Sequence, residues 1–217
     1  MRARQDGFTN NVVVLTRNHG YRKEIQGTKV PPFIYKKYPL LREAINRRSI
    51  VYNQQLEQVE RMMKPYHTWS GEERAAFYAA LVKRINNPDY FSSRIGVRIT
   101  EIQEGEAWGE LLADEGNCNS MGIVHGGCLY TLADTVCGMT AFSRGNSCTT
   151  ASATLDYLRP GRIGKRILCH GKAQKMGHTL TVVQVSITEE SGLVLATGLY
   201  TFCTMAPLNW NGETIAD

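Results

Sequence analysis

Two kinds of chemical group on one short stretch of the chain suggest a reaction. Gly126 and Gly127 follow His125 directly, and an apolar run continues from them to Phe142. Glycines at the start of a helix leave backbone N–H groups unobstructed, and the positive end of the helix dipole favours negative charge there. Asp134 is the one carboxylate in this run, and a carboxylate among apolar residues is costly unless it is paired or used. Bare amide donors and an isolated carboxylate together indicate acyl-transfer chemistry.

The spacing of these groups sets a constraint on the site. Gly126 and Asp134 are eight residues apart, which corresponds to roughly 12 Å of helix rise. A carbonyl held at Gly126 is therefore out of reach of Asp134 in the same chain. Either the two features are unrelated, or a second copy of the chain brings its own Asp134 to the Gly126 of the first. We adopt the second alternative, which predicts a homodimer with sites at the interface.

Each of these groups also has a purely structural explanation. The pair Gly126-Gly127 could serve close backbone packing at a helix start. Asp134 could be a buried carboxylate held by hydrogen bonds, and His125 a satisfied core histidine. Asn119, six residues before His125, could form a turn through its side-chain oxygen.

The bulk composition is that of a soluble globular protein. The chain has 217 residues, of which 42% are hydrophobic and 21% charged, enough for one core of ordinary size and an appendage. It contains no run of eighteen apolar residues and no signal-peptide hydrophobic region, so neither a membrane span nor a secretory signal is expected. The six cysteines form no C-x-x-C pair and mostly have apolar neighbours, which is typical of reduced, buried thiols in a cytoplasmic protein. Cys118 and Cys128 flank the glycine pair, but no basic neighbour lowers either thiol pKa, so a cysteine nucleophile is not expected.

Charge divides the chain into two regions. Residues 1–70 carry thirteen Lys/Arg against five Asp/Glu, a net of +8, whereas residues 71–217 carry twelve against fifteen, a net of −3. A mitochondrial transit peptide or a nucleic-acid-binding arm would also be basic. The basic region is poor in serine, not amphipathic and without repeated aromatic residues, so a solvated tail and no nucleic-acid partner are expected. Residues 144–178 hold seven Lys/Arg against only Asp156, which would suit a phosphate-bearing substrate.

Turn signals and hydrophobic periods predict four parts. The second predicted helix begins at Ser70-Gly-Glu-Glu73, a capping-box sequence. The parts are a basic, poorly ordered extension (1–39), a helical extension of two helices (40–87), a compact domain (88–207) and a C-terminal tail (208–217).

The compact domain is predicted to have an α+β fold. One helix, apolar on nearly every side and therefore buried, is expected from Gly126 to about Ser143. Two strand-like runs joined at Gly105 and four later runs rich in Val, Ile, Thr, Leu and Tyr, separated by short turns, predict about six antiparallel strands wrapped around this central helix. The predicted strands are 96–104, 106–114, 148–158, 165–175, 178–189 and 193–204.

Three spaced motifs carry a resemblance to a known family. They are Asn119-x5-His125-Gly-Gly-x6-Asp134, Thr150-x6-Tyr157-Leu-Arg-Pro160 and Lys175-x-Gly177. The chain resembles the hotdog-fold thioesterases, specifically the 4-hydroxybenzoyl-CoA thioesterase superfamily and its phenylacetate-pathway branch. The resemblance covers roughly residues 90–205 and leaves the extension over 1–85 unexplained.

The resemblance implies a hotdog fold that hydrolyses acyl-CoA thioesters without metal or organic cofactor. It also implies dimers, or dimers of dimers, with sites between subunits. By this resemblance the Gly126 N–H polarises the thioester carbonyl, Asn119 helps hold that carbonyl or the water, and His125 shapes the turn. Asp134 of the facing subunit acts as general base on water or attacks the carbonyl itself. Thr150 orients the water or the carboxylate, with Thr149 as the neighbouring alternative.

The resemblance further implies a path for the CoA part of the substrate, in which arginine and lysine meet phosphate groups. The implied substrate-binding residues are Gly127, Tyr157, Arg159, Arg162, Lys175, Gly177 and His178.

Two other functions stay open. A hotdog hydratase or dehydratase often has a histidine five residues after the carboxylate, where this chain has Met139. A non-catalytic acyl-CoA-binding module could use the basic extension as its interaction arm. The five histidines are scattered and none pairs with Cys or Glu at ligand spacing, so no metal site is expected. The acyl group (aryl or alkyl), the choice between dimer and tetramer, and the role of residues 1–62 are not determined by the sequence.

Overall fold

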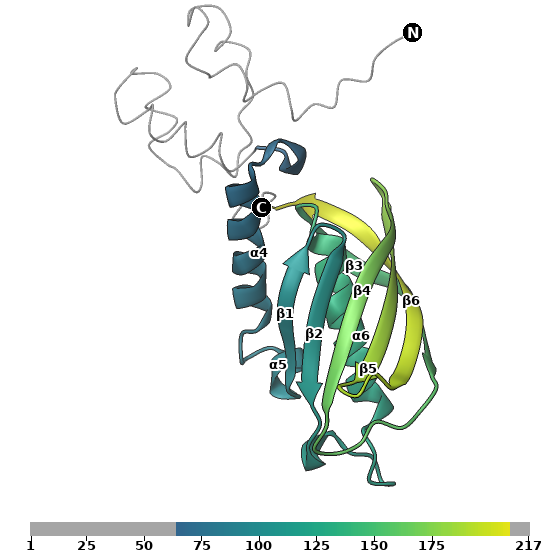
Figure 1. The fold of residues 1–217 in the computed structure, drawn as a ribbon. Coiled ribbons are helices and arrows are strands. Elements are labelled where there is room, and N and C mark those ends of the chain that lie inside the picture. The colour runs from purple at the N-terminus through teal and green to yellow at the C-terminus, as the bar shows by residue number, and fades with distance from the viewer. Residues whose placement is uncertain (1–63, 209–217) are drawn as a thin grey trace, which may run out of the picture. The chain divides into compact units, whose positions relative to one another are not determined.

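The computed structural model describes residues 64–208, and its secondary structure runs from Tyr66 to the end of the last strand (Figure 1). The predicted extension over 1–39, the first predicted helix (from Pro39 to about Met63) and residues 209–217 of the tail lie outside the described residues. The division of the chain into four parts therefore stays a prediction.

Six antiparallel strands form one sheet in the order β1-β2-β4-β5-β6-β3. The predicted number of strands and their antiparallel pairing are confirmed, and every predicted end lies within three residues of the observed one. The sequence did not give the strand order, because β3 pairs with β6 at the far edge and not with its neighbours in the chain. The strands are β1 (Val97–Gln103), β2 (Glu106–Leu112), β3 (Asn146–Tyr157), β4 (Arg166–Met176), β5 (Leu180–Glu189) and β6 (Val194–Pro207).

Helix α6 (Gly126–Phe142) lies against one face of this sheet, which curves around it (Figure 1). Leu132 and Val136 of the helix have no exposed surface and belong to the main hydrophobic core. Two strand glycines let the sheet come close to the helix. A Cβ on Gly109 would lie 2.7 Å from the Val136 side chain, and one on Gly171 would lie 2.7 Å from the Thr140 hydroxyl. The predicted hotdog arrangement, a sheet wrapped around one central helix, is confirmed.

The prediction that α6 is buried on all sides is wrong for the single chain. Gly127 and Tyr130 are exposed, and Thr131, Asp134 and Thr135 are half-buried. These five positions follow the spacing i, i+3, i+4, i+7 and i+8, so they form one stripe along the helix. We call this set the open stripe. The sequence pattern could not distinguish burial by the chain's own sheet from burial by another chain.

The two edge strands of the sheet, β1 and β3, differ in what covers their outer backbone groups. Helix α4 (Gly71–Ile85) runs alongside β1 in Figure 1, and the predicted capping box of Ser70 and Glu73 at its start is present. Directly after α4, the Asn86 side chain donates to the Ile99 carbonyl (2.8 Å) and accepts from the Ile99 N–H (2.9 Å). Asn86 therefore satisfies the strand backbone where another strand would bind. The outer edge of β3 pairs with no strand between residues 64 and 208.

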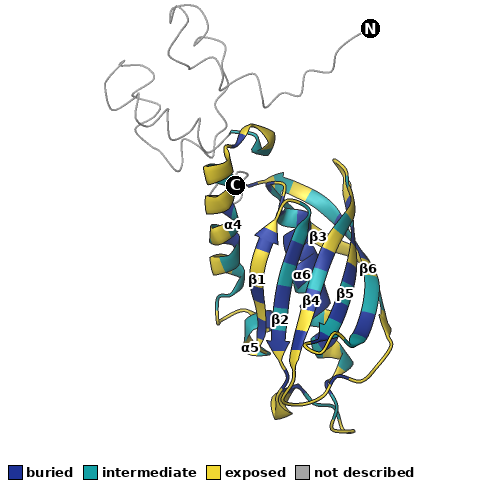
Figure 2. Cartoon of the chain, viewed as in Figure 1, coloured by how far each residue is buried: buried dark blue, intermediate teal, exposed yellow. Residues whose placement is uncertain are grey.

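The interior follows the alternation expected of a sheet with one covered face. In Figure 2 buried and more exposed residues alternate along β1 and β2. Helix α4 adds Phe77 and Leu81 to the same core, together with Trp69 just before the helix. A short helix α5 (Phe91–Arg94) connects α4 to the sheet.

The C-terminal end of α6 is closed by a buried serine. The Ser143 hydroxyl donates to the Thr140 carbonyl (2.7 Å) and accepts from the Gly105 N–H (2.8 Å). Ser143 has no exposed surface. This one hydroxyl therefore joins the end of the helix to the turn between β1 and β2.

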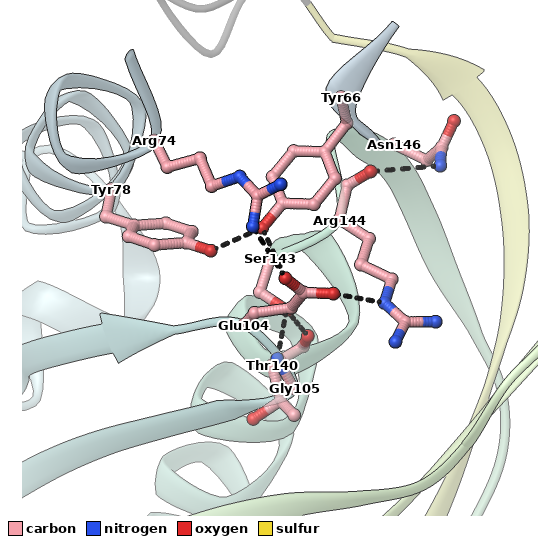
Figure 3. A network of polar contacts seen from close by, with 9 residues as sticks. All are labelled: Tyr66, Arg74, Tyr78, Glu104, Gly105, Thr140, Ser143, Arg144 and Asn146. Atoms are coloured by element: carbon pink, nitrogen blue, oxygen red, sulfur yellow. Dashed lines mark hydrogen bonds and ion pairs between the residues drawn. The ribbon is translucent and has the colours of Figure 1, made fainter. Parts of the chain in front are cut away.

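An ionic network covers the same end (Figure 3). Glu104 accepts hydrogen bonds from Arg74 of α4 (3.1 Å), from Arg144 after α6 (3.0 Å) and from the Tyr66 hydroxyl (3.2 Å). The Tyr66 hydroxyl also lies 2.6 Å from that of Tyr78. The network connects α4, the β1–β2 turn and the end of α6.

Candidate active site

The turn before α6 gives its two glycine amides different roles. The N–H of Gly127 donates to Nδ1 of His125 (2.8 Å), which makes His125 the N-cap of the helix. The His125 N–H donates to the Asn117 carbonyl (2.7 Å). Within residues 64–208 the N–H of Gly126 donates to no acceptor. One amide of the pair is thus used by the fold, and the other is available to a ligand.

Tyr157, at the end of β3, lies over this turn. Its hydroxyl donates to the Gly126 carbonyl (3.0 Å). The ring atoms Cε1 and Cζ are 3.3 Å from where a Cβ on Gly126 would be, so a side chain there would be tightly packed. The family resemblance implied that Tyr157 binds substrate, and this contact was not predicted. The sequence carries no signal for the contact, because it depends on where the end of β3 meets the helix start.

A shallow cleft of about 380 Å³ opens beside Gly126. Its walls are largely apolar, and Asn119, Tyr157 and Arg159 supply the polar side chains. Nη1 of Arg159 donates to the Val194 carbonyl (3.0 Å), which holds that side chain on the sheet. The cleft is lined by Asn119, Ile123, Val124, Gly126, Leu129, Tyr157, Leu158, Arg159, Pro160 and Gly161.

Asn119 forms the turn that its residue type allowed. Its Oδ1 accepts hydrogen bonds from the N–H groups of Met121 (2.9 Å) and Ile123 (3.4 Å). The Asn119 side-chain nitrogen donates to nothing in the described part of the chain, and the residue lines the cleft. The turn-forming explanation therefore holds for the oxygen, while the amide nitrogen is open to a ligand.

Asp134 lies on the open stripe beside the edge strand. The Thr150 hydroxyl donates to its Oδ1 (2.8 Å), and no such bond joins Asp134 to Thr149. Burial raises the pKa of the Asp134 carboxyl above its ordinary value, and the hydrogen bond from Thr150 partly opposes this rise. Asp134 does not line the cleft beside Gly126. The two groups are thus separate in one chain, as the helix rise predicts.

The remaining predicted substrate residues are not gathered in one chain. Arg162 is exposed in the connection after β3. The β4–β5 hairpin lies at the other end of α6, because the Ala173 N–H donates to the Gly105 carbonyl and Gly105 is bonded to Ser143. Exposed at that hairpin are Lys175, Gly177 and His178.

The cysteines take no visible part in this site. All six are free thiols, of which Cys137 and Cys169 are buried and the other four half-buried, so the expectation of burial is met only in part. Burial raises the pKa of the Cys128 thiol, which makes it a poor nucleophile. Among residues 64–208 no group of three or more His, Cys, Asp or Glu side chains could hold a metal ion. The expectation that no cofactor is needed stays a prediction.

No helix in the described part of the chain combines the length and the apolar character needed to cross a membrane.

Comparison with known proteins identifies the family. Residues 121–196 match the family described as the thioesterase superfamily. Acyl-coenzyme A thioesterase 13 of Mus musculus is 30% identical over 95 residues, which are 42% of this chain and 68% of that protein. Acyl-coenzyme A thioesterase PaaI of Escherichia coli is 26% identical over 108 residues, covering 50% of this chain and 77% of PaaI.

Solved structures show the same fold. The E. coli PaaI structure superposes with a TM-score of 0.58 at 21% identity, covering 62% of this chain and 97% of that one. A Streptococcus mutans protein bound to acetyl-CoA gives a TM-score of 0.51 at 24% identity, covering 52% of this chain and 91% of that one. The chain therefore belongs to the thioesterase superfamily, as a hotdog-fold thioester hydrolase of the branch that includes PaaI.

Proposed function

We propose that the chain hydrolyses acyl-CoA thioesters at a site shared by two subunits. The relatives named above as acyl-coenzyme A thioesterases support the substrate class. The observation that carries the proposal is the open stripe of α6 next to the unpaired edge of β3. The stripe leaves part of the helix uncovered by the chain's own sheet, and the unpaired strand edge beside it is a template on which another chain can pair.

The position of the stripe supports one arrangement of the two chains. It runs from Gly127 to Thr135, so its centre is at Thr131. A two-fold axis at that point would make the two helices antiparallel and set Asp134 of the partner subunit opposite Cys128. That position is two residues from Gly126, or roughly 3 Å along the helix axis. The same axis is compatible with antiparallel pairing of the two β3 edges. The hydrogen bond from Thr150 to Asp134 holds β3 beside the part of α6 through which the axis would pass.

Each group then has a chemical task. The free N–H of Gly126 polarises the thioester carbonyl and stabilises the oxyanion of the tetrahedral intermediate. Asp134 of the partner subunit takes a proton from the attacking water, and thiolate leaves as the carbonyl re-forms. A pKa raised by burial suits a general base, because such a base works best near the ambient pH. Asn119 would hold the carbonyl or the water with its unused amide nitrogen.

The substrate-binding assignments of Gly127, Arg159, Arg162, Lys175, Gly177 and His178 stay predictions. With antiparallel helices, the β4–β5 hairpin of one chain would approach the end where the other chain has its cleft. Lysine and arginine there would meet the phosphate groups of CoA.

Mixing two inactive variants tests the shared site. Gly126→Pro removes the amide hydrogen, and Asp134→Asn removes the base. Each variant alone should release CoA from a panel of aryl and alkyl acyl-CoAs at least about 100-fold more slowly than wild type. Refolded together in equal amounts, they should recover about a quarter of the wild-type rate, because random pairing gives half heterodimers with one intact site each.

The outcomes separate the alternatives. No recovery on mixing would place both groups of one site in one chain and overturn the shared site. CoA binding without turnover by the wild type would make the chain a binding module. A hydroxylamine-sensitive acyl adduct on Asp134 would assign it as the nucleophile rather than the base.

A further inference from the structure

The peptide groups around Gly126 are held from several sides. The Val124 N–H donates to the Gly161 carbonyl (3.1 Å), and the His125 N–H to the Asn117 carbonyl (2.7 Å). Both bonds fix the chain just before the glycines. Asn117 and Gly161 come from the segments that precede the turn and follow β3, so the turn is clamped between them.

The next two peptides differ in how they are held. The peptide that joins Gly126 to Gly127 is bound at both polar ends, because its N–H donates to His125 Nδ1 (2.8 Å) and its C=O accepts from the Tyr157 hydroxyl (3.0 Å). The peptide that joins His125 to Gly126 is bound at one end only. Its C=O accepts from the N–H groups of Cys128 (2.9 Å) and Leu129 (3.4 Å), while residues 64–208 provide no acceptor for its N–H. Glycine has soft backbone dihedrals, so the direction of that free N–H also depends on how firmly the neighbouring plane is fixed.

The backbone at Tyr157 is itself held by hydrogen bonds of the sheet. Its backbone pairs with Ala196 in the sheet, and the two following amides, of Leu158 and Arg159, both donate to the Leu195 carbonyl (2.8 and 3.1 Å). Its ring lies beside Gly126, with Cε1 and Cζ 3.3 Å from a Cβ built on that residue. Yet 52% of the residue is exposed in the single chain. Core packing therefore does not account for the tyrosine, and its one polar contact in the described region is with Gly126.

We infer that Tyr157 is a positioning residue for the reaction: its hydroxyl fixes the Gly126–Gly127 peptide and thereby aims the Gly126 N–H at the substrate carbonyl. This inference rests on the proposed function, and it replaces the assignment of Tyr157 to CoA binding. A carbonyl oxygen has two lone pairs, so the hydroxyl can bind it without displacing the helical hydrogen bond. The donor matters most in the transition state, where misdirection of an oxyanion donor lowers the rate without weakening substrate binding.

The test is Tyr157→Phe, which keeps the ring against Gly126 and removes only the hydrogen bond. We expect kcat to fall about two- to tenfold, the range that one net hydrogen bond supplies, with KM and the thermal midpoint unchanged. The matched control is Tyr90→Phe. Tyr90 is also about half exposed, lies at the start of α5 and uses its hydroxyl for no hydrogen bond in the described part of the chain. This control should match wild type in both constants.

Three results would overturn the inference. Unchanged kcat would show that the hydroxyl does not matter. A raised KM with unchanged kcat would return Tyr157 to substrate binding. A loss of kcat that is matched by a lower thermal midpoint would mark a general structural role.

A second measurement does not depend on turnover. With ¹⁵N-glycine labelling, the amide signals of Gly126 and Gly127 should move in Tyr157→Phe and stay in place in Tyr90→Phe. Signals that do not move in Tyr157→Phe would overturn the inference. A wild-type chain without turnover would overturn the proposed function alone, and the amide signals would still decide whether the hydroxyl fixes this peptide.

Discussion

The two ends of helix α6 use their backbone groups in opposite ways. At the C-terminal end, the Ser143 hydroxyl binds the Thr140 carbonyl, and the Glu104 network covers the surface above it. At the N-terminal end, the Gly126 N–H is left without an acceptor in the described residues and opens on a cleft. Both ends of any helix carry unsatisfied polar groups. An end that the fold closes contributes to stability, whereas an end that the fold leaves open beside a cleft is available for chemistry.

The largest effect on kcat should come from a proline at the N-terminal end of α6. Gly126→Pro removes the free N–H at the first helical position, where proline is favoured. His125 has φ −64° and ψ 134°, a conformation suited to the residue before proline. We expect kcat to fall about 100- to 1,000-fold with little change in stability.

Gly126→Ala is the matched control for this proline variant. It adds a Cβ 3.3 Å from the Tyr157 ring but keeps the N–H. Its kcat, measured by thiol release, should stay within about tenfold of wild type, since the oxyanion donor is retained. Equal losses in the two variants would mean that crowding, and not the amide hydrogen, limits the rate.

The next largest effect should come from a substitution at the C-terminal end of α6, and it should change stability without changing activity. Ser143→Ala removes a buried hydroxyl and leaves the Gly105 N–H without its acceptor. We expect the free energy of unfolding to drop by about 1–3 kcal/mol in urea denaturation, with kcat and KM unchanged at temperatures where the variant is folded. A fall in kcat without a fall in stability would contradict the division between the two ends.

A smaller loss of stability is expected from the network itself. Glu104→Gln keeps the shape of the side chain and removes the charge that meets Arg74 and Arg144. Because these ion pairs are partly exposed, the cost should be about 1 kcal/mol and should shrink in high salt. Glu101→Gln is the control, since Glu101 is exposed and forms no ion pair with residues 64–208. Equal costs for both variants would show that the network adds nothing.

The smallest effect should be a change in the pH dependence of kcat, caused by a substitution beside Asp134 in the middle of α6. Thr150→Val removes the hydrogen bond that lowers the Asp134 pKa, so burial alone acts and the pKa rises further. A higher pKa keeps the base protonated to a higher pH, and the acid limb of the kcat profile should move to higher pH. The rate on that limb should drop about two- to fivefold, while the plateau at alkaline pH is retained. Thr149→Val should leave the profile in place, and a limb that moves toward lower pH would contradict the assignment.

The sequence predicted the parts of the fold that local patterns determine. Strand-like runs divided by Gly105 and by later Gly and Pro turns indicated all six strands, and the Gly126-Gly127 pair marked the start of α6. The pairing of β3 with β6 could not be predicted, because it depends on contacts far apart in the chain. The hydrogen bonds between the Asn86 side chain and the Ile99 backbone could not be predicted either, because the sequence indicates only that a helix ends at Asn86.

The candidate site was predicted where residue type dictates the contact. The helix rise per residue predicted that Asp134 lies too far from Gly126 to act with it in one chain. The side chain of Asn119 forms the turn that its residue type allows. The open stripe was missed, because the sequence pattern of α6 does not show which of its faces the chain's own sheet covers. The bond from Tyr157 to Gly126 was missed because it depends on where the end of a distant strand meets the helix start.

The contrast between the edges of the sheet limits how far copies of the chain can accumulate. A sheet with two free margins can recruit neighbours without end and grow into a fibre. Here the Asn86 side chain occupies the backbone groups of Ile99 on the β1 margin, so within residues 64–208 β3 is the margin left for strand pairing in the proposed dimer. In the proposed dimer, joining two β3 margins would consume both, and growth by strand addition would then stop at a pair.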